Sequence, residues 1–326
     1  MSRLLKKSIR FLAPLLAVLV LFFVFEPYDY YGLHGEAAYG TRPLSSMRAL
    51  LRGQPTAIVL GDSRMANLSE AYIREVTGEN YCSLAFGGAS LGECVELFWY
   101  AAAHTKLDKV VFGINFYNAG GVQDSGRIPA VERQAGSAWA FVSHFNYWLE
   151  AFNTLKYKTQ NALGTALGRQ DWLWYPEDPT SFATAEVPSA RGAVYRRDLE
   201  DYARLIRSMT GEGYSIDDST YRQLEAVIDY CDAAGIELTI VLPPMHESIF
   251  TDVVRPLGIA GELEKLRTFL TARAVVFDFE YPNAFTANED NFYDGFHLQG
   301  PQKQLLIDVI FGNASFDCVR ISRPTT

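Results

Sequence analysis

The residue best placed to act as a nucleophile is a serine that directly follows an apolar run. Ser63 ends the triplet Gly61-Asp62-Ser63, which lies between the run at 56–60 and a segment of helical period. A serine at a strand-to-helix turn exposes its hydroxyl beside the free N–H groups and positive dipole of the helix, and Gly61 allows the tight turn. The pattern leaves two hypotheses open, because Ser63 could equally serve only as a helix cap.

A histidine and an aspartate near the C-terminus could activate this serine. Asp294 and His297 are three residues apart in DGFH, so one helical or 3₁₀ turn places them on the same side. A serine needs a general base to take its proton, and the base needs a third group to orient it. We therefore predict a catalytic triad of Ser63, His297 and Asp294. The alternative is a surface aspartate beside a histidine with a purely structural hydrogen bond.

The same pair argues only weakly for a metal site. Asp294 and His297 would need further ligands, and His246 could add one more from a distant part of the chain. Three scattered residues make a poor case for a metal, and the cysteines show no CxxC spacing. We therefore expect neither a metal nor a cofactor.

An acyl-transfer site also needs donors for the negative charge that develops on a carbonyl oxygen. The candidates are the backbone N–H of Ser63 or its neighbour, the N–H of Gly88 in FGGAS, and the side-chain amide of Asn115 in FGIN. A glycine lets the backbone approach closely, and an asparagine amide donates without adding charge. Gly88 and Asn115 could also be ordinary turn residues.

The elements that must position these residues are short apolar runs that alternate with segments of helical period. This alternation predicts a parallel sheet with helices on both faces. Ligands of open parallel sheets bind beyond the carboxyl ends of the strands, and each expected strand leads into glycine or polar residues. The five expected strands are 56–60, 81–86, 109–115, 237–244 and 274–279.

About 120 residues separate the third and fourth expected strands, which is too long for an ordinary crossover. We predict a helical insertion at about 120–215. Its aromatic-rich middle could form a lid or a partner surface, or simply the core of a helical subdomain.

The N-terminus predicts a membrane anchor. The first ten residues are basic, the run Phe11–Phe25 carries no charge, and the following EPYDYY is typical of an interfacial aromatic belt. The alternatives are a cleaved signal peptide and a buried core helix, although such a helix would usually show a polar face. By the positive-inside rule we expect a cytoplasmic segment at 1–10, a transmembrane helix at 11–27, a connector at 28–52 and an extracytoplasmic domain at 53–326.

The bulk composition argues against one class of partner. The chain has 326 residues, 48% of them hydrophobic, and a net charge of -9. Nucleic-acid binding needs a basic surface, so we expect no nucleic acid. An exported chain could pair its four cysteines in three ways, although Cys82 and Cys231 lie in apolar stretches typical of free core thiols. The other two cysteines are Cys94 and Cys318.

In their order along the chain, the blocks GDS, FGGAS, FGIN and DGFH resemble those of the SGNH (GDSL-like) hydrolase superfamily. The resemblance covers roughly 55–118 and 235–310, outside the predicted insertion. Phe116 stands where the family usually has an aspartate, which makes Asn118 an alternative to Asn115, and Arg64 replaces a common leucine. The resemblance assigns the family's named residues to Ser63, Gly88, Asn115 and His297 with Asp294.

The resemblance implies a three-layer α/β/α sandwich with a parallel, flavodoxin-like five-stranded sheet. LGDSR and LPP, together with the N-terminal anchor, are similar to a membrane-anchored branch that includes DltD-like proteins and proteins that work with membrane-bound O-acyltransferases. That branch implies a serine acyltransferase or esterase, which moves an acetyl or similar group on a cell-surface polysaccharide or lipid-linked polymer through an acyl-Ser63 intermediate. Arg64, His246 and Asn118 are candidate substrate contacts, although Arg64 could simply pair with a nearby carboxylate.

Two other functions stay open at the level of the sequence. One is a non-catalytic protein that binds the polymer or assembles with a membrane-bound O-acyltransferase. The other is a soluble secreted lipase.

Overall fold

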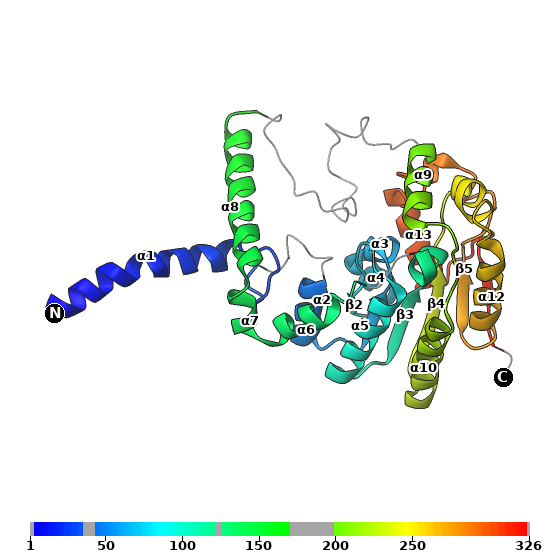
Figure 1. The fold of residues 1–326 in the computed structure, drawn as a ribbon, viewed down its shortest axis with the longest axis horizontal. Helices are drawn as coiled ribbons and strands as arrows, with labels where there is room; N and C mark the ends of the chain where they lie inside the picture. The colour runs from blue at the N-terminus through cyan, green and yellow to red at the C-terminus, as the bar shows by residue number, and fades with distance from the viewer. Residues whose placement is uncertain (1–2, 35–42, 122–124, 170–198, 325–326) are drawn as a thin grey trace. The chain divides into compact units, whose positions relative to one another are not determined.

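The computed structural model describes residues 3–34, 43–121, 125–169 and 199–324. The chain forms two compact units, which we call the helical unit and the sheet unit (Figure 1). The helical unit comprises Met1–Arg48 and Pro129–Asp178, and the sheet unit comprises Ala49–Ile128 and Pro179–Thr326.

The sheet unit is built on a mixed six-stranded sheet in the order β2-β1-β3-β4-β5-β6. Five strands run parallel to one another, as the sequence predicts, and they begin within one residue of the expected positions. The strands are β1 Ala57–Leu60, β2 Tyr81–Ser83, β3 Lys109–Gly113, β4 Glu237–Leu242, β5 Val275–Asp278 and β6 Arg320–Ser322.

The prediction of a purely parallel, five-stranded sheet is wrong at one edge. There β6 pairs antiparallel with β5, so that Ile321 lies opposite Phe277. This strand escapes sequence analysis because it is three residues long, partly exposed and without an apolar run. A central strand such as β1 is easy to find because all four of its residues are buried under helices on both faces.

Helices cover the two faces of the sheet. Apolar side chains of α4 and α13 meet Val59, Val111 and Val241 on one face. Strand residues alternate between faces, and α5, α10 and α12 pack on the other, where Figure 1 shows α5 and α10 along the sheet. The result is three layers. The helices are α4 Glu70–Thr77, α5 Leu91–His104, α10 Asp218–Ala234, α12 Ala260–Thr271 and α13 Gly300–Ile310.

A second apolar cluster lies beyond the carboxyl ends of the strands. It joins Phe116, Met245 and Phe296 from three loops to Ala203 and Ile206 of α9. The helix α9 falls inside the predicted insertion at 120–215 but belongs to the sheet unit. The elements at this end are α3 Ser63–Ala66, η1 Tyr117–Gly121, α9 Leu199–Thr210, α11 Glu247–Ile249, η4 Phe250–Val254 and η5 Glu289–Asn291.

The helical unit is held together by aromatic side chains. Phe22 stacks on Trp148 with ring centroids 4.2 Å apart, and Tyr30 stacks on Phe141 at 4.0 Å. Tyr28 and Tyr30 are buried here, so the prediction that they form an interfacial belt is wrong. Its helices are α1 Arg3–Phe25, α6 Ile128–Gly136, α7 Ala138–Val142 and α8 Phe145–Ala166, and α2 Pro43–Gly53 crosses the boundary between the units.

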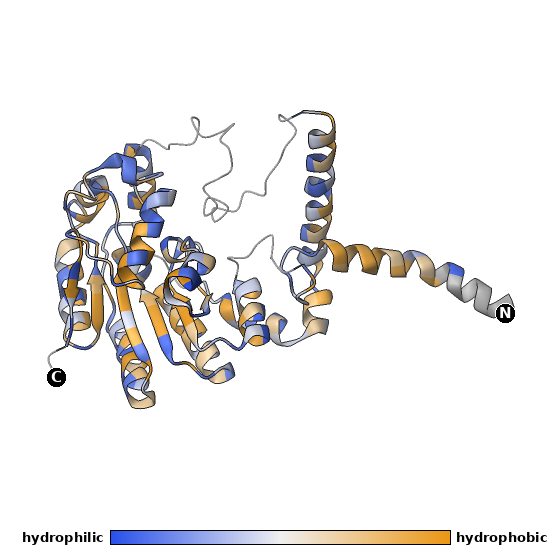
Figure 2. Ribbon diagram, turned by 180° about the vertical axis from the view of Figure 1, so that it is seen from behind, coloured by the Kyte–Doolittle hydropathy of each residue, from blue (hydrophilic) through white to orange (hydrophobic). Residues whose placement is uncertain are grey.

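The predicted transmembrane helix at 11–27 is not confirmed. Within the described parts of the chain, no helix has both the length and the apolar character needed to cross a membrane. The helix α1 ends at Phe25. Figure 2 shows the apolar colouring of the uncharged run in α1 and of the central strands.

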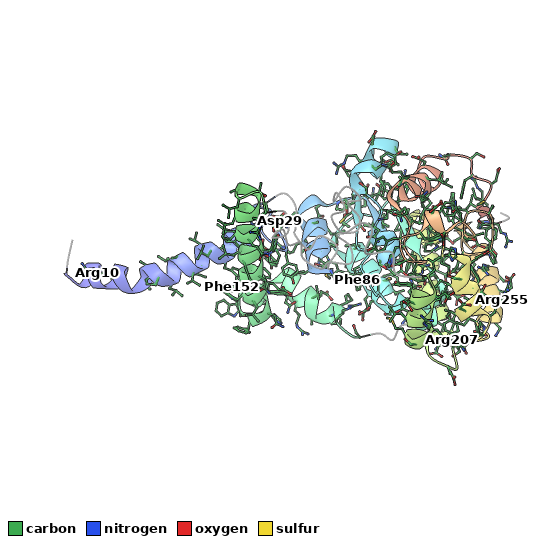
Figure 3. All side chains as sticks on the ribbon, turned by 90° about the horizontal axis from the view of Figure 1, so that it is seen from above. Arg10, Asp29, Phe86, Phe152, Arg207 and Arg255 are labelled. Carbon is green, nitrogen blue, oxygen red and sulfur yellow. The ribbon has the colours of Figure 1, made fainter. Side chains whose placement is uncertain are left out.

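Both interpretations of the aromatic-rich segment find residues to support them. Phe141 and Tyr147 are buried in the helical unit, whereas Trp139 and Phe152 are 79% and 63% exposed. Figure 3 labels Phe152 on α8. The segment therefore supplies a core and also leaves large apolar side chains on the surface.

All four cysteines are free thiols in the structure. Cys82, Cys94 and Cys231 are buried, and Cys318 is half-buried.

Candidate active site

The turn after β1 places Ser63 at the carboxyl edge of the sheet. Gly61 has φ +141°, and a Cβ on it would lie 2.6 Å from Cγ of Met65, so the turn accepts only glycine without a shift. Asp62 is the N-cap of α3 and accepts the N–H of Arg64 at 3.0 Å. Because Asp62 is the cap, Ser63 is the first helical residue, and the interpretation of Ser63 as a helix cap is wrong.

The hydroxyl of Ser63 meets the imidazole of His297. The Oγ to Nε2 distance is 2.7 Å, and on the other side of the ring Nδ1 lies 2.8 Å from Oδ2 of Asp294. With the Nδ1 proton shared with the carboxylate, Nε2 is free to accept the serine proton. The structure thus brings together the three side chains that the sequence proposes as a triad.

The aspartate is fixed from its own loop. Oδ1 of Asp294 accepts the backbone N–H groups of Phe296 at 3.0 Å and His297 at 2.8 Å. Burial alone would raise the pKa of Asp294, but His297 and these N–H groups outweigh burial and hold the pKa below its usual value. The carboxylate is therefore charged and oriented toward the imidazole at neutral pH.

The amide of Asn115 is occupied by the protein itself. Its Nδ2 donates to Oδ2 of Asp62 at 2.9 Å, and its Oδ1 accepts the N–H groups of Tyr117 and Asn118. The side chain is fully buried. Asn115 therefore locks the turn after β3 to the turn that carries Ser63.

Asn118 and Arg64 also lie below the surface. Asn118 donates to the carbonyl of Gly113 and accepts the N–H of Asn115. Arg64 pairs with Asp62 at 3.0 Å and lies 3.8 Å above the ring of Phe296. Both are buried, so we assign them structural roles. Arg64 pairs with a nearby carboxylate, as one of the two interpretations of the sequence proposed.

This pairing determines the charge state of Asp62. Burial would raise the pKa of Asp62, but Arg64 and the amide of Asn115 reverse the effect and keep the pKa low. Arg64 thereby balances the negative charge of the buried carboxylate of Asp62, directly before Ser63.

Two backbone N–H groups remain as candidate oxyanion donors. The N–H of Arg64 already donates to Asp62, whereas those of Ser63 and Gly88 have no hydrogen-bond partner among the described residues. Gly88 is exposed and has φ +66°. The N–H of Ser63, and not that of its neighbour Arg64, is therefore the candidate oxyanion donor on this side of the site.

The loop of Gly88 is fastened by an ion pair that sequence reasoning missed. Arg127 donates to the carbonyl of Gly88 at 2.9 Å and to Oε1 of Glu93 at 2.7 Å. Glu93 is 0% exposed and also closes a capping box with Ser90. The S-x-x-E pattern could have revealed the capping box, but nothing local points to Arg127.

Two further residues close to the site were also missed. Tyr202 of α9 has its ring centroid 6.2 Å from that of His297, and burial and the charge of Asp294 raise its pKa. Glu280 follows β5, is 0% exposed and accepts the N–H of Phe116 at 3.4 Å. Its Oε2 has no partner among the described residues, and burial raises the pKa of Glu280 to about 7.

His246 lies apart from the Ser63–His297 pair. It caps α11 and lines a cavity of about 450 Å³ that neither Ser63 nor His297 lines. Of the three predicted substrate contacts, His246 alone lines this cavity, and Arg64 borders only a space of about 10 Å³.

Three solved structures resemble this chain at low identity. A candidate acylhydrolase from Bacteroides fragilis has a TM-score of 0.39 and 11% identity, over 78% of this chain and 83% of that one. A candidate platelet activating factor from Streptococcus pneumoniae has a TM-score of 0.39 and 12% identity, over 91% and 97%. A candidate G-D-S-L family lipolytic protein from Desulfitobacterium hafniense has a TM-score of 0.34 and 10% identity, over 79% and 96%.

No family model matches the chain, and no curated protein matches it. Likenesses at these scores carry no argument about activity, so the function must be argued from the geometry of the site.

Proposed function

We propose that this chain is an SGNH-type serine esterase or acyltransferase with Ser63 as its nucleophile. The observation that carries the proposal is the continuous hydrogen-bonded series from Ser63 through His297 to the charged Asp294. Residues 234 positions apart in sequence meet here at the carboxyl edge of a parallel sheet, where ligands of such sheets bind.

The reaction proceeds in two steps, the acylation and then the deacylation of Ser63. Oγ of Ser63 attacks the acyl carbonyl, its proton passes to Nε2 of His297, and the N–H groups of Ser63 and Gly88 stabilise the oxyanion. The bond to the leaving alcohol breaks as that alcohol takes the proton from His297. A water or an acceptor hydroxyl then loses its proton to Nε2 of His297 and attacks the acyl-Ser63 ester. The bond to Oγ breaks as Oγ takes that proton back from His297, which releases the free acid or the acylated acceptor and regenerates Ser63.

The substrate and the place of action are part of the same proposal. The acyl group is acetyl or similar, and its partner molecule is a cell-surface polysaccharide or a lipid-linked polymer. The basic and then apolar N-terminal sequence supports a location outside the cytoplasm. Protease treatment of intact cells tests the location, because a cytoplasmic chain would stay protected.

Covalent labelling tests the nucleophile. A fluorophosphonate should label the purified full chain, and Ser63→Ala should abolish the labelling and lower p-nitrophenyl acetate hydrolysis by at least about a thousandfold. The control is Ser208→Ala, an exposed serine on α9, which should label like the original protein. Undiminished labelling of Ser63→Ala would contradict the assignment.

A second function has one observation in its favour. The exposed Trp139 and Phe152 of the helical unit suit docking to a partner, such as a membrane-bound O-acyltransferase. In that case Ser63→Ala would leave polymer acylation in cells unchanged. Loss of acylation in cells that contain normal amounts of Ser63→Ala would favour the enzyme.

A further inference from the structure

A second polar site lies beside the loop that carries Asp294 and His297. The cavity of about 450 Å³ has the size of small-molecule sites. It is formed wholly within the sheet unit. Its walls are Leu199, Glu200, His246, Glu247, Ser248, Thr251, Asp252, Glu289, Phe292 and Tyr293.

The charge of this cavity is strongly one-sided. Among the described residues, its walls contain four carboxylates, of Glu200, Glu247, Asp252 and Glu289, and no lysine or arginine. Arg207, which is nearby, donates to the backbone carbonyl of Asp252. Such a lining attracts cations and repels anions. A metal ion is a poor occupant, since no group of three or more metal-binding side chains is suitably placed in the part of the chain that the structure describes.

His246 supplies a hydrogen-bond donor on the cavity wall. Its Nδ1 accepts the backbone N–H of Ser248 at 3.1 Å, so in the neutral ring the proton lies on Nε2. Burial lowers the pKa of His246, which favours this neutral form. The side chain is 8% exposed, and its Nε2 has no hydrogen-bond partner among the described residues.

Residues of the cavity wall pack against the turn that carries Asp294 and His297. Gly295 lies between Asp294 and His297, and its carbonyl accepts the N–H of His246 at 2.8 Å. A Cβ on Gly295 would lie 3.2 Å from Leu199 and 3.8 Å from Cβ of His246, both cavity residues. A ligand in the cavity would therefore lie directly behind the turn that holds the aspartate and histidine.

We propose that this cavity binds an ammonium group with a neighbouring hydroxyl, as in an amino sugar. The carboxylates of Glu247 and Asp252 would attract the ammonium, and the N–H of His246 would donate to the hydroxyl oxygen. The further step, that this ligand is part of the substrate of Ser63, rests on the proposed function. The binding itself does not.

Binding of matched sugars to the full-length protein tests the charge preference. The probes are D-glucosamine, D-glucose and D-glucuronate at pH 6.5, measured by isothermal titration calorimetry or saturation-transfer NMR. Exposed carboxylates are partly screened by solvent, so we expect glucosamine to bind about tenfold more tightly than glucose, and glucuronate to bind most weakly. The preference should shrink in 0.5 M salt.

Variants locate the preference in the cavity. Glu247→Gln and Asp252→Asn should each reduce the ratio of glucosamine to glucose affinity about threefold, and Glu264→Gln, an exposed change outside the cavity, should not. His246→Asn keeps a side chain suited to capping α11 but loses the Nε2 donor. It should weaken both sugars about fivefold and leave their ratio unchanged, with thermal unfolding confirming that each variant folds.

The outcomes separate this site from the proposed catalysis. Equal affinity for glucosamine and glucose, or no binding of either by protein whose Ser63 still reacts with fluorophosphonate, would overturn the cavity proposal alone. A clear preference for glucosamine in protein that fluorophosphonate does not label would support the cavity and count against the esterase.

Discussion

At the scale of single residues, the two oxygens of Asp294 have different tasks. Oδ1 receives two backbone N–H groups and Oδ2 faces the imidazole. The loop therefore fixes which oxygen orients His297. This division makes the tautomer of His297 sensitive to a change of one atom.

Asp294→Asn should lower kcat for ester hydrolysis by about ten-thousandfold. The asparagine oxygen would keep the two backbone N–H groups, and its NH₂ would then face Nδ1 of His297. The imidazole proton would then lie on Nε2, so this nitrogen could no longer accept the proton of Ser63. The control is Asp290→Asn, an exposed aspartate nearby. Hydrolysis within tenfold of the original rate would contradict the role of Asp294.

Glu280 predicts a pH-dependent stability. Its pKa is about 7 in the folded chain and 4.5 in the reference state, because burial disfavours the charge. The folded state holds the extra proton between these values, so the contribution of Glu280 to stability is full below pH 4.5 and is lost as the pH rises through 7.

Glu280→Gln should therefore gain stability relative to the original chain as the pH rises. Between pH 4 and 8 the difference in free energy of unfolding should grow by about 3 kcal/mol. Denaturant titration at several pH values measures this difference, with Glu264→Gln as the exposed control. A difference that stays constant with pH would show that Glu280 is not the titrating group.

At the scale of elements, the loop after β2 depends on a segment that lies far along the chain. Arg127 joins the carbonyl of Gly88 to Glu93, near the start of α5. The side chain of Glu93 is wholly buried while that of Arg127 is 42% exposed. Loss of the arginine would leave a buried carboxylate without its cation.

Arg127→Met should destabilise the chain by about 2 kcal/mol, less than a fully buried pair because Arg127 is partly in solvent. It should also lower kcat more than it raises KM, since the N–H of Gly88 would be less well held. Addition of Glu93→Gln should recover part of the stability but none of the kcat. Arg255→Lys is an exposed control. Recovery of kcat in the double variant would argue against a positioning role of Arg127.

At the scale of the whole molecule, most large apolar side chains are buried, but some aromatic ones stay exposed. The sheet unit buries its apolar strands between helices, whereas the helical unit keeps Trp139 and Phe152 largely exposed. Exposed aromatic side chains mark a partner surface where they belong to one contiguous apolar patch.

The double change Trp139→Ser and Phe152→Ser should leave ester hydrolysis by the purified protein unchanged, because neither residue belongs to the sheet unit. If the proposed docking to a membrane-bound O-acyltransferase is correct, the double change should reduce co-purification with that enzyme at least about fivefold. The paired control is Tyr230→Ser, an exposed aromatic on α10. If the double variant and Tyr230→Ser co-purify to the same extent, there is no case for a docking surface on α7 and α8.

The sequence by itself determined the parallel strands and the chemistry at their ends. Strands such as β1 are visible because burial on both faces requires a continuous apolar run, and DGFH is visible because its two polar groups are local. Tertiary structure alone decided the rest. These features are the hydrogen bond from the amide of Asn115 to Asp62, the contact of Arg127 with Gly88 and the proximity of Tyr202 to His297. The pairing of the short strand β6 with β5 is the fourth. These contacts join residues far apart in the chain, so their energies depend on packing and leave no periodic signal in the sequence.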